Sequence, residues 1–473
     1  MRSRRSTAKP SEFSARSVPP RSICSDAALF AWTISDIVYD MGVAAQKVQD
    51  TTRSFQVRFF LVFWLFILST VAFLDRTNIS IAGVAMGQEY GLTKVQLGWV
   101  FSAFLIGYAG FQVPAGWLAV RLGPRRVLTM GVLWWGVFTA LTAVVSPSAT
   151  GALTSLLLVR VALGVGESVV YPAANQFIAR WVPAQERGKA NGWIFAGVGA
   201  GAGLTPPILN AIIESHGWRA SFWFCAVVGC IAGFIWYLAA RDRPADHPRV
   251  SLAELNHIEA GLNAEQHATR AAIPWRRIFS NRDVWALTIS YFTFGYVVWI
   301  FFSWFFIYLA EVRGLNLKTS ALYSMLPFIA MTICCLAGGV INDALVKRHG
   351  LRVGRCGLPV LALLLTAVFL VCGSMAESAG VATIVLAGGA GAIYLAQSAY
   401  WSVTADFAGV HTGVVSGVMN MGCQIGGAIT ASLTPWIASQ LGWTSAFMVA
   451  AGLAVIGALA WLFVDPRRTL RID

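Results

Sequence analysis

The stretch FFLVFWLFILSTVAFLDRTNISIAG, residues 59–83, decides the class of the fold. It opens with an unbroken apolar run, and such a run of about 20 residues crosses roughly 30 Å of hydrocarbon when it is helical. Similar runs recur as far as the C-terminus. Because backbone polar groups in lipid must be satisfied internally, helices are the expected spanning elements. We therefore expect an all-α membrane protein.

Composition supports this interpretation. Of 473 residues, 57% are hydrophobic and only 12% are charged, whereas a soluble domain carries about 25% charged residues. The polar segment 241–283 divides the expected spans into a half at 57–240 and a half at 284–465, followed by a tail at 466–473. Twelve spans are expected, at about 57–83, 95–119, 127–147, 152–179, 189–213, 220–240, 284–310, 320–345, 356–376, 381–406, 412–438 and 443–464.

The basic residues indicate the orientation of the chain. With both termini in the cytoplasm, only Lys94, Arg219, Arg313 and Lys318 of the 35 Lys and Arg residues fall in outside loops. Cytoplasmic loops carry such an excess of positive charge. The net charge of +13 therefore reports topology and not a nucleic-acid partner. We expect a multi-pass protein of the cytoplasmic (inner) membrane, embedded in the lipid bilayer as a monomer.

Several motifs of other function classes are absent from the sequence. The eight cysteines show neither a C-x-x-C pair nor metal-ligand spacing. A P-loop, a dinucleotide-binding glycine fingerprint and an H-E-x-x-H pair are also missing. We expect no metal, no cofactor and no enzymatic activity, and an ion gradient rather than ATP as the energy source.

The N-terminal segment, residues 1–56, is expected to be a disordered basic tail. It is rich in Arg, Ser and Pro, a composition that cannot form a packed core. Met41 is followed by a short polar lead into the first span, so translation starting at Met41 is a hypothesis that intact-mass measurement would test.

The two halves share landmarks at an offset of 225 residues. ERGKANG at 186–192 matches HTGVVSG at 411–417, and HGWRASF at 216–222 matches LGWTSAF at 441–447. This shared offset indicates an internal duplication. Parallel six-span repeats with a substrate site near the midplane are a transporter architecture, in which one half rocks against the other.

Four ionisable side chains fall clearly within spans: Asp75, Arg76, Arg160 and Glu167. Intramembrane charges usually face the bundle interior and mark a pathway or a proton relay. An arginine keeps its proton and presents a fork of donors to a carboxylate, so Arg76 and Arg160 are candidates to bind an organic anion. Asp75 and Glu167 are the candidate proton carriers. Protonation of a carboxylate would release a guanidinium for substrate. The alternative is a static set of ion pairs, with Arg160 reaching toward the membrane surface.

Three segments resemble a known family. GWLAVRLGPRR at 116–126 is similar to the signature after the second span of the major facilitator superfamily. The segments 164–192 and DRTNIS at 75–80 resemble its anion:cation symporters, which include galactonate, hexuronate and glucarate carriers. The signature's acidic residue is replaced by Val120, whereas the second half keeps Asp343 at the corresponding position.

This resemblance implies a major facilitator fold and further site residues. It implies proton coupling by Asp75 and Glu167, binding by the two arginines, and substrate contacts from Tyr108, Trp401 and Asn420. The candidate residues for a cytoplasmic gate are Arg121, Arg125, Arg126, Glu186, Arg187 and Asp343.

The leading hypothesis is proton-coupled symport of an organic anion, with a hexonate, hexuronate or hexarate as the expected substrate. An aromatic or other small carboxylate is the alternative within transport, because the seventh span is rich in aromatic residues and has no cation. A membrane sensor built on a transporter scaffold is a further alternative, although the segment 241–283 is too short for an added domain.

Overall fold

The computed structural model describes residues 56–148, 150–262, 273–315 and 317–468. The predicted tail at 1–56, apart from Gln56, and the alternative start at Met41 lie outside these residues, as do the last five residues. Helices make up the regular structure of the described part, which holds no strand. The all-α prediction is therefore confirmed.

The first helix set is defined as the helices that precede the segment 240–281. Trp218 opens the last of them directly after Gly217, whose φ of 79° lies in the region that favours glycine. The set comprises α2 (Val57–Glu89), α3 (Lys94–Leu122), α4 (Pro124–Val144), α5 (Ala152–Glu167), α6 (Val170–Trp181), η1 (Ala184–Glu186), α7 (Arg187–His216) and α8 (Trp218–Ala239).

A linker with short helices leads to the second helix set. The linker holds η2 (Pro244–Asp246), α9 (Leu252–Ala260) and α10 (Trp275–Ser280). The second set comprises α11 (Arg282–Ser303), α12 (Phe305–Ile307), η4 (Tyr308–Val312), α13 (Leu317–Met375), α14 (Ala379–Leu395), α15 (Gln397–Ala408), η5 (Gly409–His411), α16 (Thr412–Leu441) and α17 (Trp443–Trp461). Gly442 precedes α17 with a φ of 82°, which reproduces the role of Gly217 in the other repeat.

Ten helical stretches of the described chain are long and apolar enough to cross a membrane. Two of them are far longer than the roughly 20 residues that one crossing needs. The stretch Leu322–Met375 lies in α13, which turns at Gly350, where φ is 80°. The stretch Ala379–Leu441 is interrupted at Ala396 and again at η5. The chain is therefore a multi-pass membrane protein.

The helix of the predicted fourth span is broken directly after Glu167. Here α5 ends and α6 begins three residues later, at Val170. Pro172 explains the break, because a proline has no backbone N–H to donate and its ring clashes with the carbonyl four residues earlier. That carbonyl belongs to Ser168.

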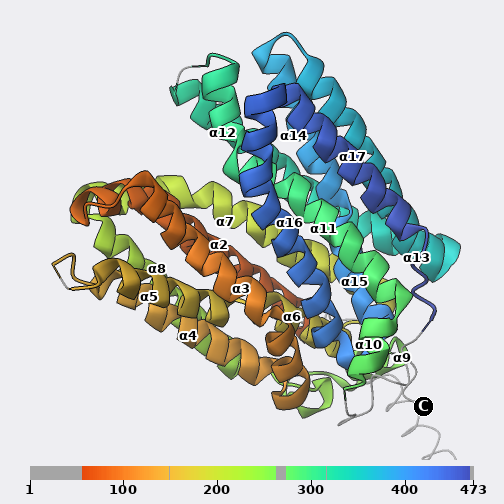
Figure 1. Ribbon diagram of the computed structural model, residues 1–473. Helices are drawn as coiled ribbons and strands as arrows, with labels where there is room; N and C mark the ends of the chain where they lie inside the picture. Colours follow the sequence, from red (N-terminus) through yellow and green to blue (C-terminus); the bar gives the residue numbers. More distant parts are fainter. Residues whose placement is uncertain (1–55, 149, 263–272, 316, 469–473) are drawn as a thin grey trace, which may run out of the picture. The chain divides into compact units, whose positions relative to one another are not determined.

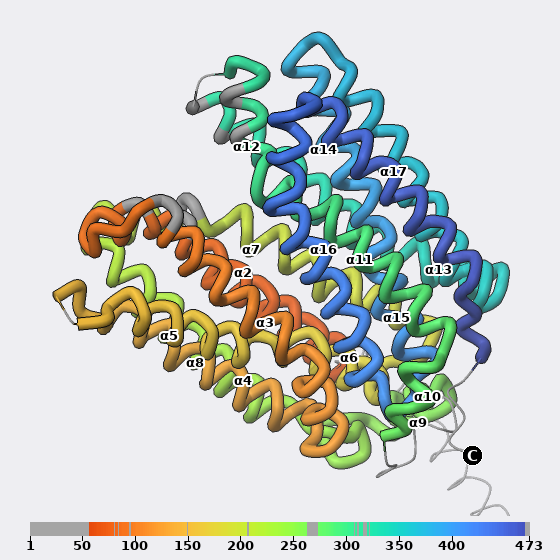
Figure 2. The backbone as a smooth tube through the Cα atoms, in the orientation of Figure 1, coloured from red at the N-terminus to blue at the C-terminus, as the bar shows by residue number. Residues whose placement is uncertain are grey.

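The two sets pack together through α3 against α16 and through α7 against α13 (Figures 1 and 2). Repeat-related glycines lie in both contacts. A Cβ on Gly192 would lie 2.9 Å from the Cys335 carbonyl, and one on Gly417 would lie 2.6 Å from the Gln112 carbonyl. Small residues let helix backbones approach this closely. We call the end of the helices at α9 and α10 the linker end and the other end the opposite end.

Candidate functional site

Arg76 and Glu167 form a buried ion pair inside the first helix set. Arg76 Nε and Nη2 both donate to Glu167 Oε1, at 3.0 and 2.6 Å. The Glu167 side chain is fully buried, and that of Arg76 is 10% exposed. The guanidinium also lies over the rings of Phe73 and Tyr108, at 4.6 and 4.5 Å from their centroids. One carboxylate oxygen of Glu167 therefore accepts both hydrogen bonds from Arg76. The other oxygen, Oε2, has no hydrogen-bond partner among the described residues.

Asp75 lies next to Arg76 in sequence but contacts a different helix. Its Oδ2 accepts a hydrogen bond of 2.6 Å from Thr139 Oγ1 of α4, whereas Arg76 turns to the end of α5. Adjacent residues of a helix diverge by about 100°, which separates the two side chains as expected. Asp75 Oδ1 has no hydrogen-bond partner in the described part of the chain.

Arg160 is buried, and most of its donors are unused. Its side chain is 1% exposed, and its Cζ lies 5.2 Å from the centroid of the Phe104 ring. Nε and Nη1 donate to no acceptor among the described residues. Asp75 and Glu167 are near enough to interact electrostatically with this guanidinium. The site thus contains a buried cation whose hydrogen-bonding capacity is open to a further anion.

Aromatic rings from both helix sets meet beside this cluster. Tyr171 of α6 stacks on Phe195 of α7 at 4.8 Å, and Trp401 of α15 lies 5.8 Å from Tyr171 and 4.9 Å from Phe195. Trp401 Nε1 donates to the hydroxyl of Tyr291 of α11 at 3.0 Å. Tyr171 also shares a hydrogen bond of 3.0 Å with Ser69.

Asn420 joins the two sets directly. Its Nδ2 donates to Gln112 Oε1 of α3 at 3.0 Å. Gln112 Nε2 and Gln424 Oε1 have no partner among the described residues, although both side chains are buried. Of the three neutral residues predicted to bind substrate, Tyr108 therefore contacts Arg76, Trp401 belongs to the aromatic cluster, and Asn420 lies in an amide pair between the sets.

Asp343 closes the linker end between α13 and α7. Its carboxylate accepts hydrogen bonds from the backbone N–H groups of Gly188 and Lys189, at 2.9 and 2.6 Å. The unsatisfied N–H groups and the dipole at a helix N-terminus favour an anion in this position. Arg355 Nη1 donates to Asp343 Oδ1 at 2.9 Å.

A second carboxylate extends this network. Asp406 of α15 pairs with Arg187 at 2.6 Å and with Arg355 at 2.8 Å. Arg355 also donates to the Ala184 carbonyl of the first set and to Asn342. The side chains of Asp406, Arg187 and Arg355 are all buried. Asp343 and Arg187, both predicted gate residues, are thus linked through Arg355 and Asp406.

The equivalent contact of the other repeat is neutral. Val120 stands where the first half would carry an acid. Here Gln176 Oε1 of α6 accepts the backbone N–H of Gly413, the second residue of α16, at 2.7 Å. An amide thus replaces the carboxylate that binds the start of α7.

The remaining predicted gate residues lie within the first set or its linker. Arg121 lies over the Trp117 ring at 5.0 Å, and Arg126 is exposed. Arg125 donates to the Tyr237 carbonyl at 2.7 and 3.0 Å. Glu186 binds Arg58 at 3.1 Å and His257 of the linker at 2.9 Å. The structure places none of these four side chains in the Asp343 network.

Several residues in these contacts were not predicted from the sequence. Arg355 lies in a basic segment with Lys347, Arg348 and Arg352, and nothing in the pattern distinguishes it from them. Thr139, Tyr171, Gln112 and Tyr291 are neutral residues in apolar runs, where a polar residue alone does not indicate its partner. In the described residues, no group of three or more His, Cys, Asp or Glu side chains could hold a metal ion.

Comparisons with known proteins identify the family. The model of the Major Facilitator Superfamily matches residues 65–431 and 352–472. The probable sulfoacetate transporter SauU of Cupriavidus necator is 34% identical, over 85% of this chain and 92% of that protein. The probable galactarate/D-glucarate transporter GudP of Escherichia coli is 30% identical, over 89% of this chain and 95% of that protein.

Solved structures show the same fold. The proton:xylose symporter XylE superposes with a TM-score of 0.69 at 14% identity, over 85% of this chain and 96% of that one. The relatives found are transporters, which confirms the expectation of a transporter and not an enzyme. The chain belongs to the major facilitator superfamily.

Proposed function

We propose that the chain carries an organic anion across the membrane together with protons, by alternating access. The observation that carries this proposal is Arg160, a buried guanidinium with Nε and Nη1 free of hydrogen bonds to any described residue. Beside it, the guanidinium of Arg76 is already occupied by Glu167. One arginine is thus ready for an anion, and the second becomes available only when Glu167 releases it.

Proton coupling follows from this arrangement. When Glu167 is ionised, Oε1 holds Arg76 through two hydrogen bonds. Protonation of the carboxylate removes the charge that holds the guanidinium, so Arg76 can turn to the anionic substrate. Asp75 serves as a second proton site, because Thr139 binds only one of its two oxygens. Proton and anion would then enter and leave together.

The topology proposed for this cycle has twelve crossings with both termini in the cytoplasm. The turn at Gly350 and the break at η5 each divide one of the ten apolar stretches, which supports two additional crossings. The moving halves are then residues 57–240 and 284–465, joined by the cytoplasmic linker 241–283. Few basic residues lie at the opposite end, which supports placing the linker end in the cytoplasm of a cell with this protein in its inner membrane.

A sugar acid is the substrate class that we propose. The cations of the charged cluster, Arg76 and Arg160, both belong to the first set. The second set contributes Trp401, Tyr291 and Asn420, whose rings and amides suit a polar, uncharged portion of a ligand. Relatives named for galactarate or glucarate and for sulfoacetate support a small acidic solute. An aromatic carboxylate is the second candidate, favoured by the cluster of Tyr171, Phe195 and Trp401.

The test is proton movement in proteoliposomes that contain the purified full chain. A panel of hexonates, hexuronates, hexarates and aromatic acids is added, and internal pH is followed. We expect one class to drive proton uptake in the wild type. Glu167→Gln should abolish accumulation driven by a pH gradient and keep exchange of labelled substrate across the membrane. Glu214→Gln, which changes an exposed carboxylate of α7, is the matched control. Unchanged proton-driven accumulation by Glu167→Gln would refute the coupling model.

A further inference from the structure

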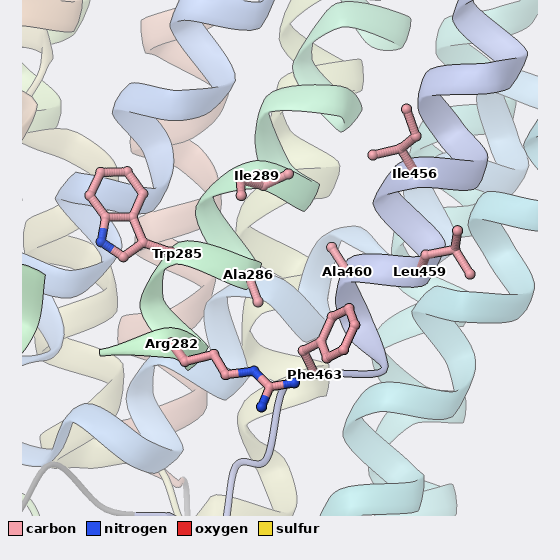
Figure 3. A pocket seen from close by; sticks show the side chains of 8 residues that line it. All are labelled: Arg282, Trp285, Ala286, Ile289, Ile456, Leu459, Ala460 and Phe463. Atoms are coloured by element: carbon pink, nitrogen blue, oxygen red, sulfur yellow. The ribbon is translucent and has the colours of Figure 1, made fainter. Parts of the chain in front are cut away.

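A groove runs along the outer surface of the second helix set between α11 and α17. Ile289 of α11 and Ile456 and Leu459 of α17 form its apolar wall, and each is about half exposed. Arg282 and Phe463 stand at its linker end (Figure 3). The groove lies outside the charged cluster and the contacts between the sets, so transport as proposed above makes no use of it.

The position of the groove along the helices matches the edge of a bilayer. Arg282 is the first residue of the apolar stretch Arg282–Ser303, and Phe463 follows the end of the stretch Trp443–Trp461. Ile289 lies seven residues farther along α11, which is roughly 10 Å deeper. The groove therefore has its arginine at the level of the lipid headgroups and its apolar wall at the level of the acyl chains.

The guanidinium of Arg282 lies over an aromatic ring and forms no ion pair with a carboxylate of the described residues. Its Cζ lies 4.6 Å from the centroid of the Phe463 ring. The side chain is exposed and takes part in no ion pair with another residue that the structure describes. Two acids that lie close in sequence to Arg282 and Phe463, Asp283 and Asp465, have other partners. Asp283 accepts the backbone N–H of Asp465 at 2.8 Å, and Asp465 binds Arg467 at 2.9 Å.

The corresponding start of the first set is closed by protein. There, Glu254 of the linker helix α9 accepts the backbone N–H groups of Val57 and Arg58, at 3.1 and 3.0 Å. It also binds the Arg58 side chain at 3.3 Å. In the second set, Asn281 caps the start of α11 instead, and no carboxylate of the described chain reaches Arg282. Val57, the first residue of α2, is thus covered by Glu254, whereas Arg282, which stands 225 residues later at the first position of α11, is open at the membrane edge.

We propose that this groove binds an anionic phospholipid. The phosphate pairs with Arg282, and one acyl chain lies against Ile289, Ile456 and Leu459. Arg467 and Arg468, whose side chains are 60% and 64% exposed, share the carboxylate of Asp465 at 2.9 and 3.8 Å, so together they add one net positive charge just beyond α17. A basic side chain near the membrane surface attracts anionic lipid by about 1 kcal/mol. A neutral lipid would fill the same apolar wall without this contribution.

The test uses the full chain purified in a neutral detergent. Thermal unfolding is followed while dioleoylphosphatidylglycerol or dioleoylphosphatidylcholine is titrated, and bound lipids are counted by native mass spectrometry. We expect tighter binding of phosphatidylglycerol to the wild type. Arg282→Gln should weaken its apparent affinity roughly fivefold, the factor that corresponds to about 1 kcal/mol. Arg348→Gln, which removes an exposed arginine at the same end but away from the groove, should leave the affinity unchanged.

A second variant tests the acyl part of the site. Leu459→Trp fills the groove from a half-exposed position, so it should reduce binding of both lipids without unfolding the protein. Glycerol 3-phosphate, which has the headgroup chemistry without the chains, should not stabilise the protein. Equal effects of Arg282→Gln and Arg348→Gln would overturn the proposal, because they would indicate diffuse surface charge. Equal binding of the two lipids by the wild type would also overturn it.

Discussion

Asp343 of α13 and Gly188 of α7 belong to different helix sets, yet the carboxylate Oδ1 accepts the Gly188 backbone N–H at 2.9 Å. A Cβ on Gly188 would lie 2.5 Å from that oxygen, so only glycine permits the contact. The linker end is therefore held by a carboxylate that reaches a bare helix N-terminus. Arg355 connects this carboxylate to Asp406.

Removal of Arg355 should open the linker end. Arg355→Gln leaves the buried carboxylates of Asp343 and Asp406 with less compensation, and breaking such a buried pair typically costs about 3–5 kcal/mol. We expect faster maleimide labelling of Cys335, which is buried in the contact with Gly192. The measurement uses a background in which the other cysteines are replaced. Arg348→Gln is the control, and equal labelling of the two variants would contradict the prediction.

A side chain at Gly116 should have the same effect through sterics alone. An added Cβ there would overlap the Gly413 carbonyl of α16, whereas one on Gly110 of the same helix meets nothing within 4 Å. Gly116→Ala should therefore increase Cys335 labelling and slow transport, and Gly110→Ala should change neither. If Gly116→Ala labels and transports like the wild type, the close contact is not required for closure.

Arg160 should matter more for substrate than for stability. Arg160→Gln removes a donor fork in which Nε and Nη1 bind no described residue, so few native hydrogen bonds are lost. Hydrogen bonds to charged groups contribute about 1.5–3 kcal/mol, so we expect substrate affinity to fall about 10- to 100-fold. Binding is measured by isothermal calorimetry and stability by thermal unfolding. A large loss of stability with unchanged affinity would favour the static ion-pair alternative.

Glu89 should make a small contribution to stability that depends on pH. Hydrogen bonds from the Arg219 guanidinium, and then from the Trp218 indole, hold the pKa of this carboxyl below its ordinary value. A lowered pKa stabilises the fold above the unfolded pKa of about 4.3 and ceases to do so as the pH falls through the folded value. Glu89→Gln should therefore lower Tm slightly near neutral pH, and the difference should vanish in strong acid.

Solvent exposure of the ion pair limits the contribution of Glu89 to stability. The Arg219 and Glu89 side chains are 35% and 38% exposed, and surface ion pairs contribute little. Glu214→Gln, at an exposed position of the same end, should show no gap that depends on pH. A gap for Glu89→Gln that grows on acidification would reverse the assigned sign.

Hydropathy predicted the helical stretches well, because a membrane span is a property of about 20 consecutive residues. It does not show that the helices on both sides of Gly350 extend beyond the expected spans at 320–345 and 356–376, into the polar residues 346–355. Asn342 Nδ2 donates to the Gly354 carbonyl at 2.9 Å and ties the two arms together. A polar segment can be helical when its side chains are bound, and hydropathy does not detect such partners.

The members of the charged cluster were predictable from the sequence, but the ion pairs among them were not. The sequence identified Asp75, Arg76, Arg160 and Glu167, because ionisable residues are rare within spans. It could not indicate that Arg76 pairs with Glu167 while Nε and Nη1 of Arg160 bind no described residue, since that depends on how side chains of different helices meet in the folded bundle. Their roles in transport stay predictions until the variants are measured.

The break in front of Pro172 gives Glu167 a mechanical setting as well as an electrostatic one. Glu167 is the last residue of α5, and Tyr171, which touches Trp401 of the other set, stands just beyond the break in α6. Pro172 removes one backbone hydrogen bond here, and sharp helix kinks are almost always found at such positions. Bending at this point would turn the carboxylate relative to the aromatic contact, so the charge of Glu167 and the angle between α5 and α6 would change together.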